Sequence, residues 1–365
     1  MHVIDLKLEN TESRVNLCPD TQYWASPTRL KLESNGFELP YRLAYKTWGT
    51  LNSRRDNAIL VVHALSGSAD IEAWWPELLG TDKPLDPKTD FVICINLLGS
   101  CYGSSGPLSQ NPDQAQAWQI DFPALSIRDQ VRAQAALIRR LGIQKLRAII
   151  GPSLGGMIAL EWALLEPALT GALVLIATTA QHSAQAIANS SCQRAAIRLD
   201  PNFLQGYYPP NQQPEQGLAL ARQLAFITYR SNLEFTQRFN RQEGCEQAFA
   251  IQDYLQHQGI KFTDRFDANS YIRLSECMNS HDISRARDSA ERVLQTIQQP
   301  TLVISLEHDQ LYTYSEQAQL AEHIPNAQHE LIRTRYGHDG FLIETKSMSV
   351  VLNRFLKNQG RENHE

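Results

Sequence analysis

Short apolar runs alternate with longer amphipathic segments along most of the chain. Such runs, nearly continuous in hydrophobicity and rich in β-branched residues, are typical of strands covered on both faces of a parallel sheet. Five of them stand out, at 58–62, 91–95, 148–150, 172–176 and 301–305. Residues 127–141 have apolar positions at helical spacing and end at Gly142, which predicts a helix with a glycine stop, and 157–165 predicts another helix. This alternation predicts an open, mostly parallel α/β sheet.

The strand pattern stops between residues 181 and 290. This segment is rich in Gln, Asn and Arg, and amphipathic runs at 216–229, 232–241 and 246–257 predict helices. It is too long for an ordinary loop. We therefore expect a core made of residues 1–180 and 291–365 and an inserted helical cap at 181–290; the alternative is a separate helical domain with no part in the chemistry. Residues 358–365 are expected to form a frayed tail.

Composition and charge exclude several classes of protein. The chain has 365 residues, 42% of them hydrophobic and 20% charged, and a formal net charge of −5. The absence of a basic field argues against binding to nucleic acid or to an anionic membrane. Charged residues interrupt the first nine positions, so we expect no signal peptide, and no apolar run is long enough to span a membrane.

Six cysteines are scattered along the chain without a C-x-x-C pair. In a chain of this length such cysteines are typical of reduced thiols in a cytoplasmic protein. Cys101 lies in a glycine-rich loop and is expected to be a buried, inert thiol. We expect no metal site.

The segment Gly151-Pro152-Ser153-Leu154-Gly155 carries the strongest chemical signal in the chain. It matches G-x-S-x-G directly after an expected strand and before an expected helix, the context in which this pattern presents a nucleophilic serine. The N-terminus of the helix offers free N–H groups to a developing oxyanion. An ordinary glycine-rich turn is the alternative, and the flanking strand and helix argue against it.

A nucleophilic serine in this architecture needs an acid and a histidine that follow it in the order Ser, Asp or Glu, His. Among the late histidines, only His338 lies in a tight loop between an expected strand and a helix. His329 lies within an expected strand, His323 on a polar helix and His364 in the tail. For the acid, the end of the strand at 301–305 offers Asp309, which we prefer, and Glu307, which stays open as the alternative. Ser153 would be the nucleophile, His338 the general base and then acid, and the carboxylate its orienter.

Two backbone groups are candidates for the oxyanion hole. One is the N–H of Leu154, the residue after the nucleophile, and the other is the N–H of Leu65, in the loop after the strand at 58–62.

Several longer segments match a known family in its own order, from near the N-terminus to near the C-terminus. They include Tyr45-Lys46-Thr47-Trp48-Gly49-Thr50-Leu51-Asn52, residues 63–67, 96–107, 151–157 and 228–230, Arg265-Phe266-Asp267-Ala268-Asn269-Ser270-Tyr271, and Tyr336-Gly337-His338-Asp339-Gly340-Phe341-Leu342. In these segments the chain resembles the homoserine O-acyltransferases, the homoserine O-acetyltransferase family of the α/β-hydrolase superfamily. The resemblance implies an α/β-hydrolase fold with a mostly parallel sheet and an inserted helical cap.

The resemblance also implies roles for particular residues. Ser153, Asp309 and His338 match the catalytic triad of the family, and Arg222 and Asp339 match its substrate-binding residues. A guanidinium suits the carboxylate of an amino acid, and an aspartate suits its ammonium group.

The implied reaction has a ping-pong mechanism. Ser153 takes an acyl group, preferably acetyl, from acyl-CoA and passes it to the hydroxyl of L-homoserine, a step in methionine biosynthesis. Acyl-CoA is a co-substrate, no cofactor is bound permanently, and no phosphate-binding loop is present, so the cap and the mouth of the site would bind CoA. The resemblance further implies a homodimer built through the cap.

The glycine-rich loop departs from the family at Ser100, where many members have glycine, and at Ser104-Ser105, where they have threonines. Because these residues are expected near the acyl pocket, a succinyl-CoA donor and an L-serine acceptor stay open as alternatives. Two other readings are an esterase on the same fold and a catalytically idle binding protein.

Overall fold

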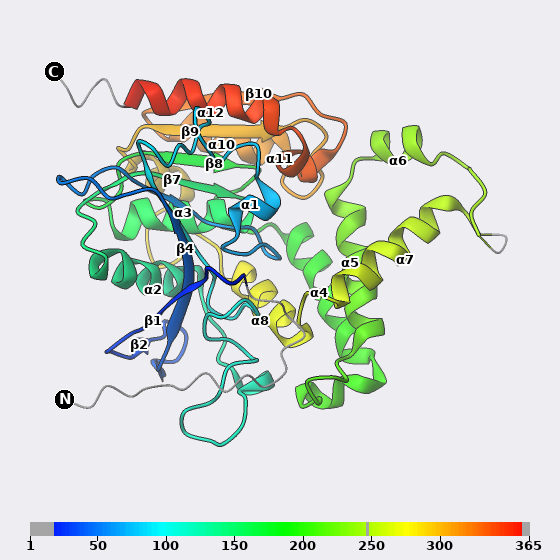
Figure 1. Cartoon of the computed structure of the whole chain (residues 1–365). Helices are drawn as coiled ribbons and strands as arrows, with labels where there is room; N and C mark the ends of the chain where they lie inside the picture. The colour runs from blue at the N-terminus through cyan, green and yellow to red at the C-terminus, as the bar shows by residue number, and fades with distance from the viewer. Residues whose placement is uncertain (1–17, 246–247, 360–365) are drawn as a thin grey trace.

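The apolar runs form the strands of one eight-stranded sheet at the centre of the protein (Figure 1). The structure is a computed structural model, and it describes residues 18–245 and 248–359. Across the sheet the strands are β1 (Gln22–Ala25), β4 (Arg42–Trp48), β6 (Phe91–Ile95), β5 (Ala58–Val61), β7 (Leu146–Pro152), β8 (Leu173–Ile176), β9 (Thr301–Leu306) and β10 (Ala327–Ile332). β4 is antiparallel to both of its neighbours, and all pairings from β6 to β10 are parallel. The prediction of a mostly parallel α/β sheet is confirmed.

The elements expected from the hydrophobic pattern appear close to their predicted bounds. All five predicted runs are strands, and α2 (Ile127–Arg140) ends before Gly142, whose φ of 77° suits glycine. The second predicted helix is α3 (Leu154–Leu165), which begins three residues earlier than expected, directly after Ser153. The antiparallel strands β1 and β4 and the small hairpin of β2 (Leu30–Lys31) and β3 (Glu38–Leu39) were not predicted.

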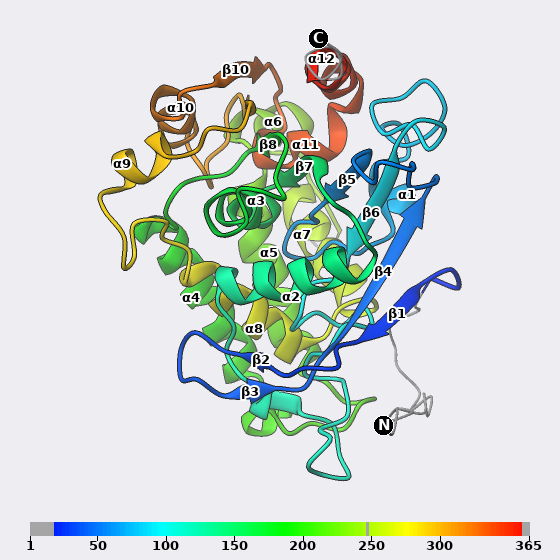
Figure 2. The same ribbon diagram turned by 90° about the vertical axis from the view of Figure 1, so that its left-hand side faces the viewer.

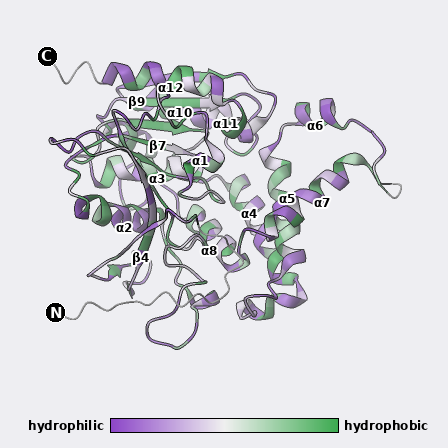
Figure 3. Ribbon diagram, viewed as in Figure 1, coloured by the Kyte–Doolittle hydropathy of each residue, from purple (hydrophilic) through white to green (hydrophobic). Residues whose placement is uncertain are grey.

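Helices cover both faces of the sheet (Figure 2). One face packs against α2, α3, α9 (Ala290–Gln295) and α10 (Tyr314–His323), and the other against α1 (Ile71–Trp74), α11 (Gly340–Ile343) and α12 (Thr345–Gln359). Successive residues of a strand point to opposite faces, so Leu60 joins the first core and Ile59 the second. Burial on both faces explains why the strands are hydrophobic throughout, as β9 is in Figure 3, whereas α12 alternates.

Between β8 and α9 the chain forms helices that lie mainly to one side of the sheet (Figure 1). They are α4 (Ala184–Leu199), the 3-10 helix η2 (Pro201–Gly206), α5 (Glu215–Tyr229), α6 (Asn232–Arg238), α7 (Ala250–Thr263) and α8 (Ala268–Asn279). The three predicted amphipathic runs correspond to α5, α6 and α7, whereas α4 and α8 were not predicted. In its described part, the segment 181–290 contains isolated bridges but no strand. The division into a core and a cap stays a prediction.

The two connections between these helices and the sheet are paired with each other. Gln181 and Asp282 form an antiparallel bridge, and the N–H of His182 donates to the carbonyl of His281 at 2.9 Å. The Gln181 amide also donates to the Asp282 carboxylate at 3.0 Å. The segment between residues 182 and 281 therefore starts and ends at one short, hydrogen-bonded hinge.

Some sequence expectations fall at or beyond the ends of the described residues. Positions 1–9, the basis for expecting no signal peptide, and residues 360–365, with His364, lie outside them. The expected tail was wrong at 358 and 359, because α12 extends through Gln359. Within residues 18–245 and 248–359, no helix combines the length and apolar character that a membrane crossing requires.

Three histidines are buried in the neutral form. Burial lowers the pKa of His63, His182 and His281 to about 4 in each case, from an ordinary value of 6.5. Each ring has a hydrogen-bonding partner for one nitrogen at least: Ala64 O and Leu97 N for His63, the Tyr312 hydroxyl for His182 and Thr179 O for His281.

These histidines make the folded protein sensitive to acid. As the pH falls from 6.5, the unfolded chain takes up protons at these positions and the folded protein does not, so the free energy of unfolding decreases. The expected loss is about 1.5 kcal/mol for each histidine between pH 6.5 and pH 5. Urea unfolding at a series of pH values measures it. An exposed-histidine variant, His308→Gln, should keep the same slope, and a flat profile between pH 6.5 and pH 5 would contradict the prediction.

Candidate active site

Ser153 lies at a sharp turn between β7 and α3. Its backbone has φ 55° and ψ −120°, an unusual conformation for a residue with a side chain. The N–H of Ser153 donates to Ile176 O at 2.8 Å, and its carbonyl accepts from the Thr178 hydroxyl at 2.9 Å. A Cβ atom on Gly151 would lie 2.1 Å from Gly155 O, and one on Gly155 would lie 2.1 Å from Val62 O. Glycine is therefore required at both positions for the turn to pack against its neighbours.

Two other side chains extend from Ser153 in a hydrogen-bonded line. His338 Nε2 lies 2.9 Å from Ser153 Oγ, and His338 Nδ1 lies 2.8 Å from Asp309 Oδ2. The other carboxylate oxygen of Asp309 accepts from the N–H groups of Leu311 and Tyr312, at 2.9 and 3.1 Å. Asp309 follows β9, and His338 lies in the 3-10 helix η3 (Gly337–Asp339) after β10. The structure thus brings together the three residues proposed from sequence, with Asp309 rather than Glu307 beside the histidine.

Aromatic rings surround the imidazole of His338. The centroids of Tyr229, Tyr312 and Phe341 lie 5.6, 5.4 and 5.6 Å from it. His338 is 3% exposed and Ser153 is 4% exposed. The pair therefore lies in a largely dry environment, where a charge that develops during a reaction is weakly screened.

A cavity of about 500 Å³ opens onto this line. Ser153 and His338 line it together with Leu65, Arg222 and Asp339, so five of the seven predicted site residues face one space. The sixth, Asp309, lies behind His338. Leu154 contributes no side chain to the lining, but its N–H starts helix α3 beside Ser153.

Both predicted oxyanion donors are free among the described residues: neither the N–H of Leu65 nor that of Leu154 has a hydrogen-bond acceptor there. The buried His63 fixes the direction of the Leu65 N–H. Its Nε2 accepts from Leu97 N at 3.2 Å, so Nδ1 carries the proton and donates to Ala64 O at 2.8 Å. The Ala64 carbonyl and the Leu65 N–H belong to one trans peptide unit and point in opposite directions.

The guanidinium of Arg222 lies among aromatic rings of α5 and α7. It stacks over Phe226 and Phe262, with its Cζ 4.6 and 4.7 Å from the ring centroids. Desolvation lowers the pKa of Arg222. Within residues 18–245 and 248–359 it has no hydrogen bond or ion pair. A cation that is held by rings and faces a cavity is suited to bind a carboxylate.

Asp339 has a partner that sequence reasoning missed. Arg230 Nε lies 2.9 Å from Asp339 Oδ2, although its N–H is not aligned for a hydrogen bond. The ion pair orients the carboxylate. Arg230 is the last residue of the segment 228–230 that resembles the family, but no sequence signal links it to Asp339, because 109 positions separate the two residues.

Two further sequence expectations concern residues near this site. Cys101 is 5% exposed, burial raises the pKa of its thiol, and it does not line the cavity. His329, on β10, bonds to the Ser305 hydroxyl at 2.7 Å, which is a structural role. Arg265 and Tyr102 line the cavity and were not singled out for any role.

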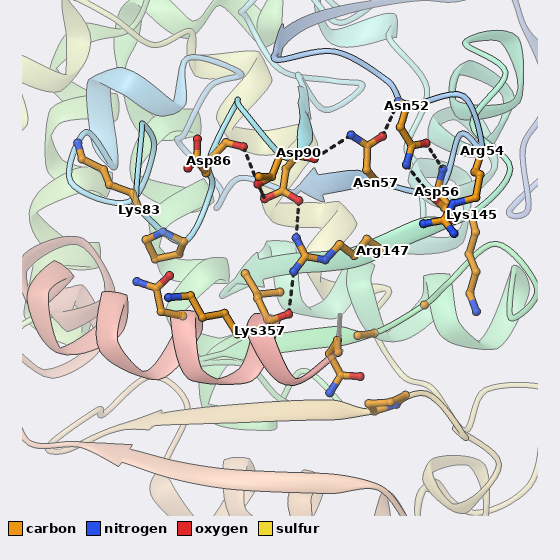
Figure 4. Close-up of a pocket in the computed structure, with 18 of the residues that line it drawn as sticks. Asn52, Arg54, Asp56, Asn57, Lys83, Asp86, Asp90, Lys145, Arg147 and Lys357 are labelled. Carbon is orange, nitrogen blue, oxygen red and sulfur yellow. Dashed lines mark hydrogen bonds and ion pairs between the residues drawn. The ribbon is translucent and has the colours of Figure 1, made fainter. Parts of the chain in front are cut away.

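A larger cavity, of about 900 Å³, lies at the ends of the strands opposite to Ser153, where β5, β7 and β8 begin (Figure 4). Its charged and amide side chains largely bond to one another and to the backbone. Arg147 pairs with Asp90 and donates to Leu356 O at 2.7 Å, and the Asn52 amide donates to Asp56 at 2.7 Å. It contains no serine or histidine, so the chemistry belongs to the smaller cavity.

Comparison with known proteins agrees with this geometry. The family described as the alpha/beta hydrolase fold matches residues 57–345. A homoserine O-acetyltransferase of Trichormus variabilis is 49% identical over 92% of this chain and 93% of its own length.

Two solved structures show the same fold. The homoserine O-acetyltransferase of Bacillus anthracis superposes with a TM-score of 0.86 at 26% identity, covering 92% of this chain and 97% of its own. An acetylester hydrolase from Corynebacterium glutamicum superposes with a TM-score of 0.82 at 26% identity, covering 92% and 96%. From the identity to the first relative and the length over which it extends, this chain belongs to the homoserine O-acetyltransferase family of enzymes, within the alpha/beta hydrolase fold.

Proposed function

We propose that this enzyme transfers an acetyl group from acetyl-CoA to the hydroxyl of L-homoserine through an acyl-serine intermediate. The observation that carries the proposal is the hydrogen-bonded line Asp309–His338–Ser153, which opens onto a cavity that also holds Arg222 and Asp339. The line supplies a nucleophile and its base. The two charged side chains match the carboxylate and the ammonium group of an amino acid.

In the first half-reaction Ser153 Oγ attacks the thioester carbonyl, and His338 Nε2 takes its proton. Negative charge develops on the carbonyl oxygen and is stabilised by the N–H groups of Leu65 and Leu154. When the tetrahedral intermediate collapses, the C–S bond breaks and the thiol leaves with the proton from His338. Asp309 accepts a hydrogen bond from His338 Nδ1 throughout and stabilises the imidazolium.

In the second half-reaction the acceptor hydroxyl loses its proton to His338 and attacks the acyl carbon. The bond from that carbon to Ser153 Oγ then breaks, and His338 returns the proton to Ser153. Arg222 would bind the carboxylate of homoserine and Asp339 its ammonium group, which directs the hydroxyl to the ester. The burial of Ser153 and the aromatic rings around His338 limit access of water to that ester. These features support transfer over hydrolysis.

We also propose a cellular role and an assembly for this enzyme. The role is cytoplasmic, in methionine biosynthesis, and the assembly is a homodimer built through the cap. The second receives support from three exposed apolar side chains on cap helices, Leu220, Ile227 and Ile260.

Thiol release tests the proposed reaction. Acetyl-CoA and succinyl-CoA are each supplied with L-homoserine, L-serine or no acceptor. Release from acetyl-CoA that depends on homoserine supports the proposal. Faster release from succinyl-CoA would show that succinyl-CoA, and not acetyl-CoA, is the donor. Release that depends on serine would show that L-serine is the acceptor. Release that is independent of any acceptor would identify a hydrolase, as in the structural neighbour from Corynebacterium glutamicum.

Replacing Arg222 with alanine is expected to raise the KM for homoserine by about 30- to 100-fold, because a charged hydrogen-bonding partner of the carboxylate is lost. The KM for the acyl donor should change by less than about twofold, since the donor carries no α-carboxylate for this residue to bind. Steady-state kinetics with each substrate varied in turn measure both values. Arg241→Ala, an exposed cap variant, is the control. An unchanged KM for homoserine would remove Arg222 from carboxylate binding.

A further inference from the structure

A guanidinium from the cap segment reaches the loop that carries the Leu65 N–H. Arg265, between α7 and α8, donates from Nη1 to Ser66 O at 2.8 Å and to the Tyr102 hydroxyl at 2.9 Å. The Tyr102 hydroxyl in turn donates to Arg265 O at 3.0 Å. Arg265, Tyr102, Leu65 and Ser66 all line the active-site cavity. Within the described residues Arg265 has no carboxylate partner, so its charge is not neutralised by an ion pair.

The bond to Ser66 continues through two peptide units. The Ser66 carbonyl and the Gly67 N–H belong to one unit, and the Gly67 N–H donates to Ala64 O at 2.9 Å. The Ala64 carbonyl belongs to the same unit as the Leu65 N–H. Because the C=O and N–H of a trans peptide point in opposite directions, the hydrogen bonds run in one sense from Arg265 to Leu65.

This direction matters for electrostatics. Hydrogen bonds in a chain polarise one another. A cation that donates to the first carbonyl of the chain therefore strengthens the last N–H of the chain as a donor. Arg265 polarises the Ser66 carbonyl, which makes the Gly67 N–H a stronger donor to Ala64 O, and the Leu65 N–H is strengthened in turn. The neutral His63 adds a second hydrogen bond to Ala64 O. A Cβ atom on Gly67 would lie 2.9 Å from His63 Cβ, so the turn that closes the chain requires glycine.

We infer that Arg265 is a positioning residue for the oxyanion hole: through the peptide units 66–67 and 64–65 it orients and polarises the Leu65 N–H. The inference rests on the proposed function, because it requires that Leu65 N–H to face the oxyanion. It also gives the cap segment a part in the chemistry of the core, since the cation that strengthens the oxyanion donor comes from the cap.

A trifluoromethyl ketone with a short alkyl chain tests this directly. Ser153 Oγ adds to its carbonyl carbon, the carbonyl π electrons move to oxygen, and the serine proton goes to His338. The resulting hemiketal oxygen occupies the oxyanion hole, and 19F NMR follows its ionisation. In Arg265→Met the pKa of the hemiketal should rise by about one unit and kcat for acyl transfer should fall about tenfold, while both KM values stay within twofold. Arg265→Lys, which keeps the charge and one donor, should recover most of both effects.

Arg198→Met is the matched control, because Arg198 is a cap arginine that, among the described residues, forms its ion pair with Glu276 and does not line the cavity. It should leave the hemiketal pKa and kcat unchanged. An Arg265→Met enzyme with an unchanged hemiketal pKa would overturn the inference, as would a loss confined to the KM of the acyl donor, which would make Arg265 a donor-binding residue. Failure of the wild-type enzyme to form the adduct would instead count against Ser153 and the proposed function.

Discussion

Replacing Ser153 with alanine is expected to lower kcat for acyl transfer roughly ten-thousand-fold or more, because Ser153 is the proposed nucleophile and no other hydroxyl of the described residues bonds to His338 Nε2. His338 Nε2 lies 2.9 Å from Ser153 Oγ and would lose the hydroxyl from which it takes the first proton. Substrate binding should persist, since Arg222 and Asp339 are untouched. Fixed-time assays of acetyl-homoserine formation measure the loss of kcat, and titration with homoserine measures binding separately.

The unusual backbone at Ser153 supplies a control for folding. Alanine keeps the Cβ atom and the strain at φ 55°, so Ser153→Ala should have the Tm of the wild type. Ser153→Gly removes that strain and should have a higher Tm, with activity equally low. Appreciable turnover by either variant would remove Ser153 from the role of nucleophile.

Replacing Asp309 with asparagine is expected to lower kcat by roughly a thousand- to ten-thousand-fold. Oδ1 of Asp309 accepts from two backbone N–H groups, so an amide at this position would turn its oxygen toward them. Its NH₂ group would then face His338 Nδ1 and donate to it. That arrangement places the imidazole proton on Nε2, where it blocks proton transfer from Ser153.

Glu307→Gln is the matched control for the orienting carboxylate. Glu307 lies two residues away from Asp309 on the same loop and makes no hydrogen bond to His338 among the described residues. Its variant should keep kcat within about twofold of the wild type. Comparable losses in the two variants would mean that the effect of Asp309→Asn comes from the loop and not from the tautomer of His338.

The parts of the fold that could be predicted from sequence are those in which local pattern and environment agree. Strands buried on both faces must be hydrophobic throughout, so β5 to β9 were visible as apolar runs. β4 was missed because it contains Lys46, which is 4% exposed and depends on Asp70 at 2.8 Å and Glu72 at 3.3 Å to be buried. α4 was missed because five of its nine apolar residues are alanines, which leave only a weak amphipathic pattern.

The same distinction holds for the site. The elbow around Ser153 is a local motif, and chain order with the loop at His338 then predicts the base and limits the acid to Asp309, which was preferred, or Glu307, so the triad could be proposed without coordinates. The Arg230–Asp339 pair and the bond from Arg265 to Ser66 join residues 109 and 199 positions apart, and neither leaves a local pattern. The choice between Asp309 and Glu307 also required three-dimensional geometry.

The hinge at Gln181 and Asp282 has a consequence for how this architecture can diversify. Because the two ends of the inserted segment are hydrogen-bonded neighbours, the intervening helices can lengthen, shorten or be exchanged with little strain on β8 and β9. Arg222 belongs to the inserted segment, whereas the proposed nucleophile Ser153 and its base His338 lie outside it. Changes around Arg222 can therefore alter the proposed contact with the acceptor carboxylate, provided that they keep Arg265, while Ser153, His338 and Asp339 stay in place on the core.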